Sequence, residues 1–171
     1  MPAVQAVGVG FHLLVFREFT YNTRNFSESM QTFFPGRSAI AFTVLGDPVP
    51  QPRPRVTTRG KFARAYTPSS HPINGYRAAI AEAARQAGAK PVADMPLTIE
   101  IDFVFSRPKS HFNKKGLKQG VPVLPRADVT NCVKGVEDAL NGIAYVDDRQ
   151  LCSVTATKAW GEEALTRVRI S

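Results

Sequence analysis

Four residues between positions 128 and 148 could act together on a phosphodiester. Asp128 precedes a stretch with helical periodicity, Lys134 lies within that stretch, and Asp147 and Asp148 follow it. Magnesium takes oxygen ligands, often one or two carboxylates completed by water and phosphate. A metal held in this way can activate water, and a lysine can stabilise charge that develops on the phosphate or the leaving oxygen. These residue types therefore predict magnesium-dependent hydrolysis of a nucleic-acid backbone.

A helix from about Val129 to Asn141 would position these residues. At 100° per residue, one arc of about 120° holds only core-forming side chains. They are Val129, Cys132, Val133, Val136, Ala139 and Leu140. Asn131, Lys134 and Asp138 fall on the opposite, wet side of the same helix. Gly142 is a natural C-terminal break, and the short connection after it can return Asp148 close to Asp128.

Each of these residues also has a simpler structural role. Asp128 could be the helix N-cap, a position that favours aspartate, although its two carboxylate oxygens would let it cap and bind metal together. Lys134 could pair with Asp138, four residues on. An isolated Asp147–Asp148 pair is more often a solvated turn, but the other polar residues nearby favour a metal site here.

The rest of the chain predicts a single α+β domain. Apolar, β-branched runs indicate strands at residues 39–46, 97–105, 151–158 and 165–170. Apolar residues at three- and four-residue steps indicate a helix at 72–88. The order β-α-β-α-β-β predicts a small mixed β-sheet covered by two helices. The proline-rich segment 48–68 is expected to form a loop or an irregular ribbon, and segment 106–127 a basic loop.

Residues 1–38 differ from the domain at 39–171. They lack a steady period, so we expect an N-terminal extension, partly disordered, with a short strand within residues 7–16 and Met30 as an alternative start. No signal peptide is predicted, because the apolar segment 7–16 lacks a basic flank and a cleavage site. Cys132 and Cys152 make no zinc or disulfide pattern and are expected to be small buried hydrophobes. A reducing cytoplasm fits this cysteine usage, and no apolar run is long enough to span a membrane.

Basic residues gather in two segments that contain no acid. The chain carries a net charge of +8, and residues 48–81 and 103–127 hold more than half of its 22 Lys and Arg side chains. Candidates for phosphate contact are Arg53, Arg55, Arg59, Lys61, Arg64, Arg107, Lys109, Lys114, Lys115, Lys118 and Arg126. Aromatic or imidazole rings lie among them and could stack on unpaired bases. These segments predict recognition of nucleic-acid backbone and shape, whereas two merely solvated loops would be the simpler explanation.

Three motifs together resemble the RusA family of Holliday junction resolvases, the crossover junction endodeoxyribonucleases of bacteria and their phages. They are D-x-x-N-x-x-K from Asp128, D-A-L-N-G-I from Asp138, and D-D-x-Q from Asp147. Upstream, GDPVPQPRPRVTTRGKFARAYTP resembles the family's opening loop, and RPKSHFNKKGLKQGVPVLPRADVTN resembles the approach to its active site. The resemblance covers roughly residues 39–171.

The resemblance implies a homodimeric, Mg²⁺-dependent endonuclease, with Mn²⁺ as a substitute metal. Such an enzyme would resolve four-way DNA junctions by paired symmetric nicks, during recombination and repair in the cytoplasm of a bacterial or phage-infected cell. Asp128, Lys134 and Asp148 match the catalytic residues, with Asp128 and Asp148 as metal ligands and Asp147 as a further candidate. Asn131 matches the motif asparagine.

One position departs from the family pattern. The family commonly reads D-x-D-N, whereas this chain reads Asp128-Val129-Thr130-Asn131. A threonine hydroxyl is a poor ligand compared with a carboxylate, so metal affinity could fall, or Asp138 or Asp147 could contribute. Three hypotheses follow: a structure-selective DNA endonuclease, a junction-binding protein whose chemistry is impaired by Thr130, and a basic RNA-associated or structural protein.

Overall fold

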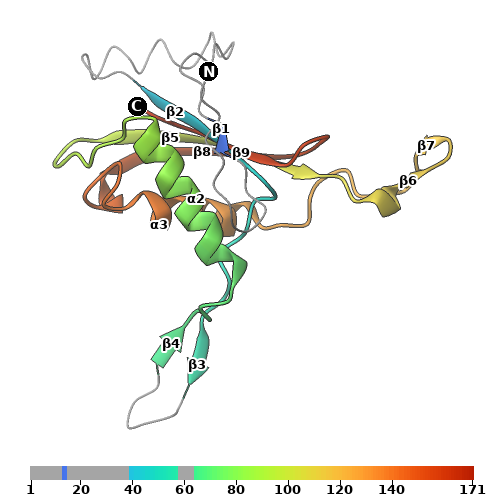
Figure 1. Ribbon diagram of the computed structural model, residues 1–171, viewed down its shortest axis with the longest axis horizontal. Helices are drawn as coiled ribbons and strands as arrows, with labels where there is room; N and C mark the ends of the chain where they lie inside the picture. The colour runs from blue at the N-terminus through green and yellow to red at the C-terminus, as the bar shows by residue number, and fades with distance from the viewer. Residues whose placement is uncertain (1–12, 15–38, 58–63) are drawn as a thin grey trace.

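One mixed β-sheet forms the centre of the computed structural model, which describes residues 13–14, 39–57 and 64–171 (Figure 1). Its strand order is β1-β2-β9-β5-β8. The bounds are β1 Leu13–Leu14, β2 Ile40–Leu45, β5 Leu97–Ser106, β8 Leu151–Gly161 and β9 Leu165–Ile170. Strand β5 pairs antiparallel with β9 and parallel with β8. The predicted α+β class with a mixed sheet is therefore confirmed, and β1 is a two-residue strand within residues 7–16, where a short strand was expected.

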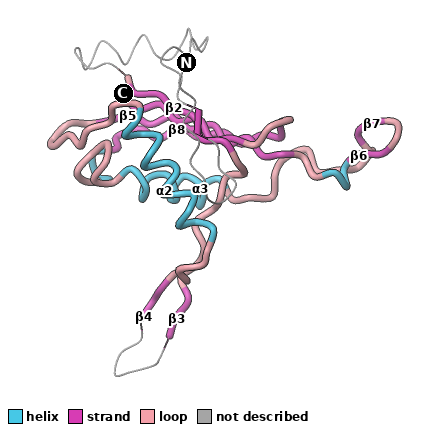
Figure 2. Tube along the Cα trace, in the orientation of Figure 1, coloured by secondary structure: helices cyan, strands magenta, loops and turns pink. Residues whose placement is uncertain are grey.

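Two helices cover one face of this sheet. They are α2, Pro72–Gln86, and α3, Val129–Leu140 (Figure 2). Along β5 the buried side chains alternate with half-buried ones, which is the pattern of a strand packed on one side. Buried residues of both helices belong to the same core cluster as Ile99, Ile101 and Phe103 of β5. The apolar residues that recur at three- and four-residue steps in both helices therefore face this core, as predicted.

Gly135 lets α3 approach its neighbours closely. A Cβ at this position would lie 3.2 Å from Ile73 Cδ1 of α2 and 3.4 Å from the carbonyl oxygen of Val49. The first separation is tighter than an ordinary carbon contact, and the second is at the lower edge of ordinary van der Waals contact. The glycine thus allows α2 and the proline-rich segment to pack directly against the helix that begins at Asp128.

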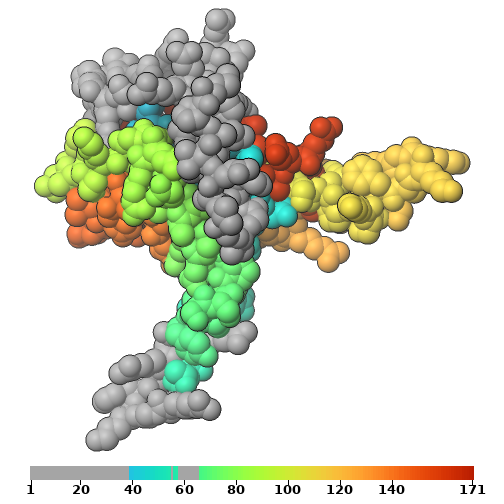
Figure 3. All heavy atoms as spheres, in the orientation of Figure 1, coloured from blue at the N-terminus to red at the C-terminus, as the bar shows by residue number. Residues whose placement is uncertain are grey.

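Two basic hairpins project from this body (Figures 1 and 3). The first pairs β3, Arg55–Thr57, with β4, Arg64–Tyr66. The second pairs β6, Phe112–Asn113, with β7, Gly116–Leu117, after the short 3₁₀ helix Lys109–His111. We expected a loop or irregular ribbon at the first and a loop at the second. Strands of two or three residues show no period in a sequence, which is why these hairpins were not predicted.

Strand β8 lies at the edge of the sheet, and this overturns one expectation. Cys132 is buried as predicted, but Cys152 is exposed, because among the described strands β8 pairs only with β5. The thiol of Cys152 donates to the carbonyl oxygen of Leu97 at 3.3 Å. In the part of the chain that the structure describes, no helix has the length and apolar character needed to cross a membrane.

Candidate functional site

Asp128 caps the N-terminus of α3 with one of its two carboxylate oxygens. Oδ1 accepts bonds from the Thr130 amide at 2.9 Å, the Thr130 hydroxyl at 2.6 Å and the Asn131 amide at 3.4 Å. These bonds, the hydroxyl first, lower the pKa of Asp128 below its ordinary value. The second oxygen, Oδ2, receives no hydrogen bond from the described residues. Asp128 is therefore both an N-cap and an exposed, ionised carboxylate with one open oxygen.

Thr130 has a defined role at this helix end. Its hydroxyl donates to Oδ1 of Asp128, so the residue that replaces the expected aspartate supports the remaining one. A second carboxylate at this position would add a negative charge beside Asp128, whereas the threonine adds a donor. The chain thus has one strongly held carboxylate at the start of α3 in place of two.

The wet face of α3 carries the residues that the sequence placed there. Asn131, Lys134 and Asp138 are all exposed. Asp138 is ion-paired with Arg77 of α2, which also donates to Gln51 Oε1 at 2.6 Å. The simpler role for Lys134, a pair with Asp138, is therefore wrong. Within the described residues Lys134 makes no ion pair, and its ammonium group remains available on the helix surface.

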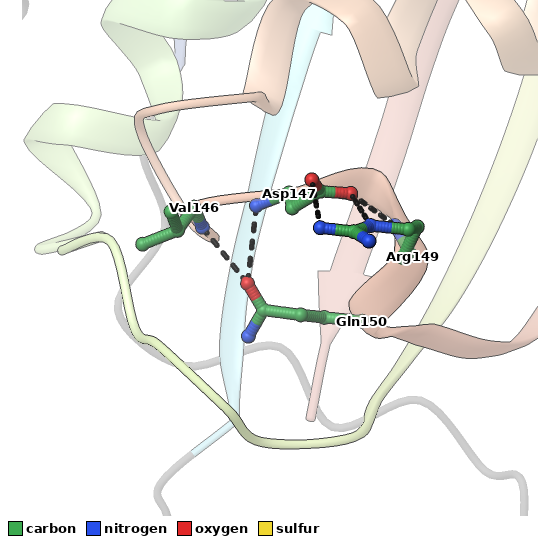
Figure 4. Close-up of polar contacts among 4 residues, drawn as sticks. All are labelled: Val146, Asp147, Arg149 and Gln150. Carbon is green, nitrogen blue, oxygen red and sulfur yellow. Dashed lines mark hydrogen bonds and ion pairs between the residues drawn. The ribbon is translucent and has the colours of Figure 1, made fainter.

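The Asp147 side chain is hydrogen-bonded and ion-paired within the turn that it begins (Figure 4). It caps the 3₁₀ helix Asp148–Gln150, accepting from the Arg149 amide at 2.9 Å, and it forms an ion pair with the Arg149 guanidinium at 2.9 Å. Gln150 Oε1 accepts from the Asp147 amide at 3.1 Å, which completes a capping box. The Arg149 side chain is the main cause that lowers the pKa of Asp147 to about 2. Asp147 is thus held by Arg149, whereas its neighbour Asp148 is exposed.

Asp148 belongs to a charged group along the later turns of α3. Burial, followed by the negative charges of Asp148 and Asp138, raises the pKa of Glu137, while the charge of Lys134 opposes this shift. The Tyr145 hydroxyl donates to the Glu137 carbonyl oxygen at 2.8 Å and so ties the loop before Asp148 to the helix. The charges of Asp148 and Lys134 thus both act on Glu137 in the later part of α3, whereas the expected approach of Asp148 to Asp128 stays a prediction.

The donor set fits a hydrated magnesium ion. Within the described chain no three His, Cys, Asp or Glu residues are close enough together to hold a metal by themselves. Exposed carboxylates such as Asp128 and Asp148 supply the oxygen ligands that Mg²⁺ prefers. Magnesium commonly keeps several waters and takes the rest of its ligands from phosphate, so a cage of protein groups is not required.

Lys158 of β8 is the residue that the sequence reasoning missed. Its Nζ donates to the carbonyl oxygen of Ala127 at 2.7 Å, and its charge contributes to the lowered pKa of Asp128. Strand β8 places it in register with Phe103, whose side chain is buried under the helices. The sequence did contain a signal for Lys158, namely a lysine at a strand position where the alternation of side chains predicts the helix-covered face of the sheet.

The first basic segment is anchored at the start of α3. The amide of Gln51 donates to the carbonyl oxygen of Asn131 at 2.9 Å, which places the exposed Arg53 near this helix. Arg55 and Arg64 lie on the paired strands β3 and β4. Arg59 and Lys61 lie outside the described residues.

The second basic segment is anchored on Trp160 of β8. The Arg107 guanidinium lies 5.2 Å from the Trp160 ring centroid, and the indole Nε1 donates to the Pro122 carbonyl oxygen at 3.0 Å. Lys118 Nζ donates to the Ser110 carbonyl oxygen at 2.8 Å. The exposed cations of this second basic segment, called the second arm below, are Lys109, Lys114, Lys115, Lys118 and Arg126. Arg107 is half-buried and helps to fix the arm, although it was predicted only as a DNA contact.

Comparisons with known proteins identified a matching family and a similar protein. The family model of the endodeoxyribonuclease RusA matches residues 46–171. The chain is also similar to the uncharacterized protein YqaN of Bacillus subtilis (strain 168), with 32% identity over 136 residues, which cover 77% of this chain and 94% of that protein. The family match over residues 46–171 includes both basic hairpins, the helix that begins at Asp128 and the turn that carries Asp148. The chain belongs to the RusA family of endodeoxyribonucleases.

Proposed function

We propose that this protein is a magnesium-dependent endonuclease that resolves four-way DNA junctions by paired symmetric nicks. The observation that carries the proposal is the state of Asp128. One of its oxygens is fixed by the first turn of α3, and the other is open on the exposed surface, on the helix that also bears Lys134. In a chain of the RusA endodeoxyribonuclease family, this is an arrangement suited to holding a metal against a phosphate.

Each residue has a separate role in this proposal. Asp128, through Oδ2, and Asp148 would hold Mg²⁺, with Mn²⁺ as a substitute. The bound ion would supply an activated water and positive charge at the phosphate. Lys134 would donate to the phosphate oxygen or to the leaving oxygen, where negative charge develops during cleavage. Its lack of an ion-pair partner among the described residues supports this role.

The two basic arms, which carry the hairpins β3–β4 and β6–β7, would hold the DNA. They project from the body in two different directions (Figure 1), and their segments contain no acid that would cancel the local field. Lysine and arginine contacts to phosphates provide affinity without reading the sequence. A homodimer would present four such arms with two-fold symmetry, which suits a junction that is cut at two related positions.

A junction-binding protein without cleavage is the second candidate, and Thr130 is the observation that favours it. The helix start supplies one carboxylate where the family commonly has two, and no three-carboxylate site forms among the described residues. Such a protein would bind branched DNA tightly through the same arms and would leave it intact in every divalent metal.

Cleavage of a synthetic four-way junction, beside a linear duplex of the same sequence, tests these functions. The wild type, Asp148→Asn and Asp94→Asn would each be assayed with and without Mg²⁺ and Mn²⁺. Asp94 is an exposed aspartate before β5 and provides a matched control. Paired nicks that need the metal and Asp148, but not Asp94, would support the resolvase. Junction binding without nicks in either metal would favour the second candidate, and equal cutting of the duplex would remove junction selectivity.

A further inference from the structure

Lys158 lies against the proposed site and has no role in the mechanism above. Because β8 runs parallel to β5 and pairs Lys158 with Phe103, the lysine side chain leaves the sheet on the face that the helices cover. It is half-buried there. Its Nζ reaches the carbonyl oxygen of Ala127 at 2.7 Å, across 31 residues of sequence. This is a charge-assisted bond, which is stronger than a bond between neutral groups.

The bond acts on the peptide group that leads into Asp128. The Ala127 carbonyl and the Asp128 amide nitrogen share one plane, so holding that oxygen also restricts the backbone of Asp128. On the other side, the first turn of α3 holds Oδ1 of the same residue through Thr130 and Asn131. Asp128 is thus restrained both before and after its Cα atom, while Oδ2 stays open.

The charge of Lys158 is also placed at this end of α3. It contributes to the lowered pKa of Asp128, after the hydrogen bonds from Thr130 and Asn131. It also opposes the burial and the Asp128 charge that together raise the pKa of the Cys132 thiol to about 11. Within the described residues, Lys158 is the cation whose ammonium bonds the backbone just before α3.

We propose that Lys158 is a positioning residue of the nuclease site, which holds the Ala127–Asp128 peptide so that the open oxygen of Asp128 is presented to the metal. The proposal rests on the proposed function, because it assigns metal binding to Asp128. It differs from a purely structural tie between β8 and α3, since it requires an effect on metal affinity in the folded protein. Outer partners of metal ligands usually have this effect, and their loss typically costs about 10- to 100-fold in affinity or activity.

Metal binding without DNA provides the first test. Mn²⁺ would be titrated calorimetrically into the full-length wild type, Lys158→Met, Lys158→Arg and the control Lys90→Met, which changes an exposed lysine after α2. We expect Lys158→Met to weaken binding about tenfold, Lys158→Arg to retain most of the affinity, and Lys90→Met to match the wild type. Unchanged or tighter binding by Lys158→Met would overturn the proposal, because an ammonium acting by charge alone would repel the metal.

Cleavage kinetics and unfolding complete the test. We expect Lys158→Met to lower kcat for the junction at saturating Mg²⁺ with little change in KM, and Lys158→Arg to restore much of kcat. If Lys158→Met does not fold, Lys158→Gln keeps a donor without the charge, and we expect it to bind Mn²⁺ less tightly than the wild type and more tightly than Asp128→Asn. Equal binding by Lys158→Gln and the wild type would then overturn the proposal.

The two proposals fail in different ways. A wild type that binds Mn²⁺ but cuts no junction would contradict the proposed function, while the calorimetric comparison would still decide the role of Lys158. A wild type that cuts, together with an equally active and equally metal-bound Lys158→Met, would leave the function standing and remove the inference. A wild type that binds no divalent metal would overturn both.

Discussion

The Thr130 hydroxyl donates a 2.6 Å hydrogen bond to Oδ1 of Asp128, so the residue that departs from the family pattern supports the proposed metal ligand. Thr130→Asp would replace this donor with the second carboxylate common in the family. We expect the Mg²⁺ concentration for half-maximal cleavage to fall several-fold, because two carboxylates attract the ion more strongly than one. Magnesium titrations of junction cleavage measure this midpoint.

Thr130→Asn is the matched control for Thr130→Asp, since asparagine has nearly the same shape as aspartate but lacks its negative charge. Its magnesium midpoint should not fall below that of the wild type. A Thr130→Asp midpoint that equals or exceeds the wild-type value would mean that the family's second carboxylate has no place in this site.

Arg77 of α2 connects three parts of the structure. It is ion-paired with Asp138 of α3 and donates to Gln51 Oε1, which lies in the first basic segment. Its side chain is 27% exposed and that of Asp138 36%, so solvent screens the pair only in part. We expect Arg77→Met to lower the free energy of unfolding by roughly 1 kcal/mol. Urea unfolding measures the change.

Arg85 of the same helix offers the comparison. It pairs with Glu82 at 3.5 Å, but both side chains are more than half exposed. We expect Arg85→Met to cost less than about 0.5 kcal/mol, since exposed pairs of this kind contribute little. Equal losses for the two variants would show that the Arg77 contacts do not hold the helices together.

The ion pair between Asp147 and Arg149 gives the protein an acid-sensitive contribution to stability. The pKa of Asp147 is lowered from 3.8 in its ordinary state to about 2 in the folded chain. The folded state therefore holds this proton less tightly than the unfolded state. The stabilisation is present above pH 4 and is lost as the pH falls through about 2. Asp147→Asn should remove this part of the pH dependence.

Chemical unfolding at pH 6 and at pH 3 measures that difference. We expect the stability gap between the wild type and Asp147→Asn to be larger at pH 6 than at pH 3. Asp94→Asn, which changes an exposed aspartate outside this turn, provides the reference. A gap that is the same at both pH values would contradict the role of Arg149 in holding the ionised carboxylate.

Gly135 is a position where helix propensity and packing oppose each other. Alanine would favour the helix by about 1 kcal/mol, but its Cβ would lie 3.2 Å from Cδ1 of the fully buried Ile73. Overpacking of this kind costs about 1–3 kcal/mol. We expect Gly135→Ala to destabilise the fold and Ile73→Val, which removes Cδ1, to relieve part of the loss. A double-mutant cycle by urea unfolding measures the coupling, and additive losses would argue against the contact.

Local pattern was sufficient for much of the fold. The spacing of Ile73, Tyr76 and Ile80 predicted α2, and Asp128 with Gly142 bounded α3 to within a residue. These features depend on neighbours a few positions apart, so a single sequence contains them. The exposure of Cys152 was not predicted, because whether a strand lies at a sheet edge depends on topology and not on its own residues.

The contacts that build the site could not be predicted from local sequence pattern, because they join residues that are far apart in the chain. Lys158 meets Ala127 because β8 lies parallel to β5, and Arg77 meets Asp138 across 61 residues because α2 and α3 pack together. Residue types predicted Asp128 and Lys134 as participants, but not which groups restrain them. Arg107 shows the same limit, since its position over Trp160 depends on the path of the whole second arm.

The second arm makes a prediction about salt dependence. Lys109, Lys114 and Lys115 are exposed, and within the described residues their ammonium groups make no hydrogen bond or ion pair, unlike that of Lys118, which donates to the Ser110 carbonyl oxygen. If each contacts one phosphate, changing all three to Met should reduce the slope of log Kd against log salt by about 2.7, which is about 0.9 per contact. The triple variant should bind junctions more weakly at every salt concentration, while its melting temperature stays close to that of the wild type.

Trp160→Phe separates the charge of this arm from its placement. The substitution keeps an aromatic ring at the root of the arm but removes the indole donor to the Pro122 carbonyl oxygen. All the lysines remain, so the salt slope should change by less than one contact. The junction affinity should nevertheless fall, because an arm that is less firmly held loses more conformational entropy on binding. Fluorescence anisotropy at several salt concentrations measures both quantities. A Trp160→Phe protein with wild-type affinity would show that the arm does not need this anchor to hold DNA.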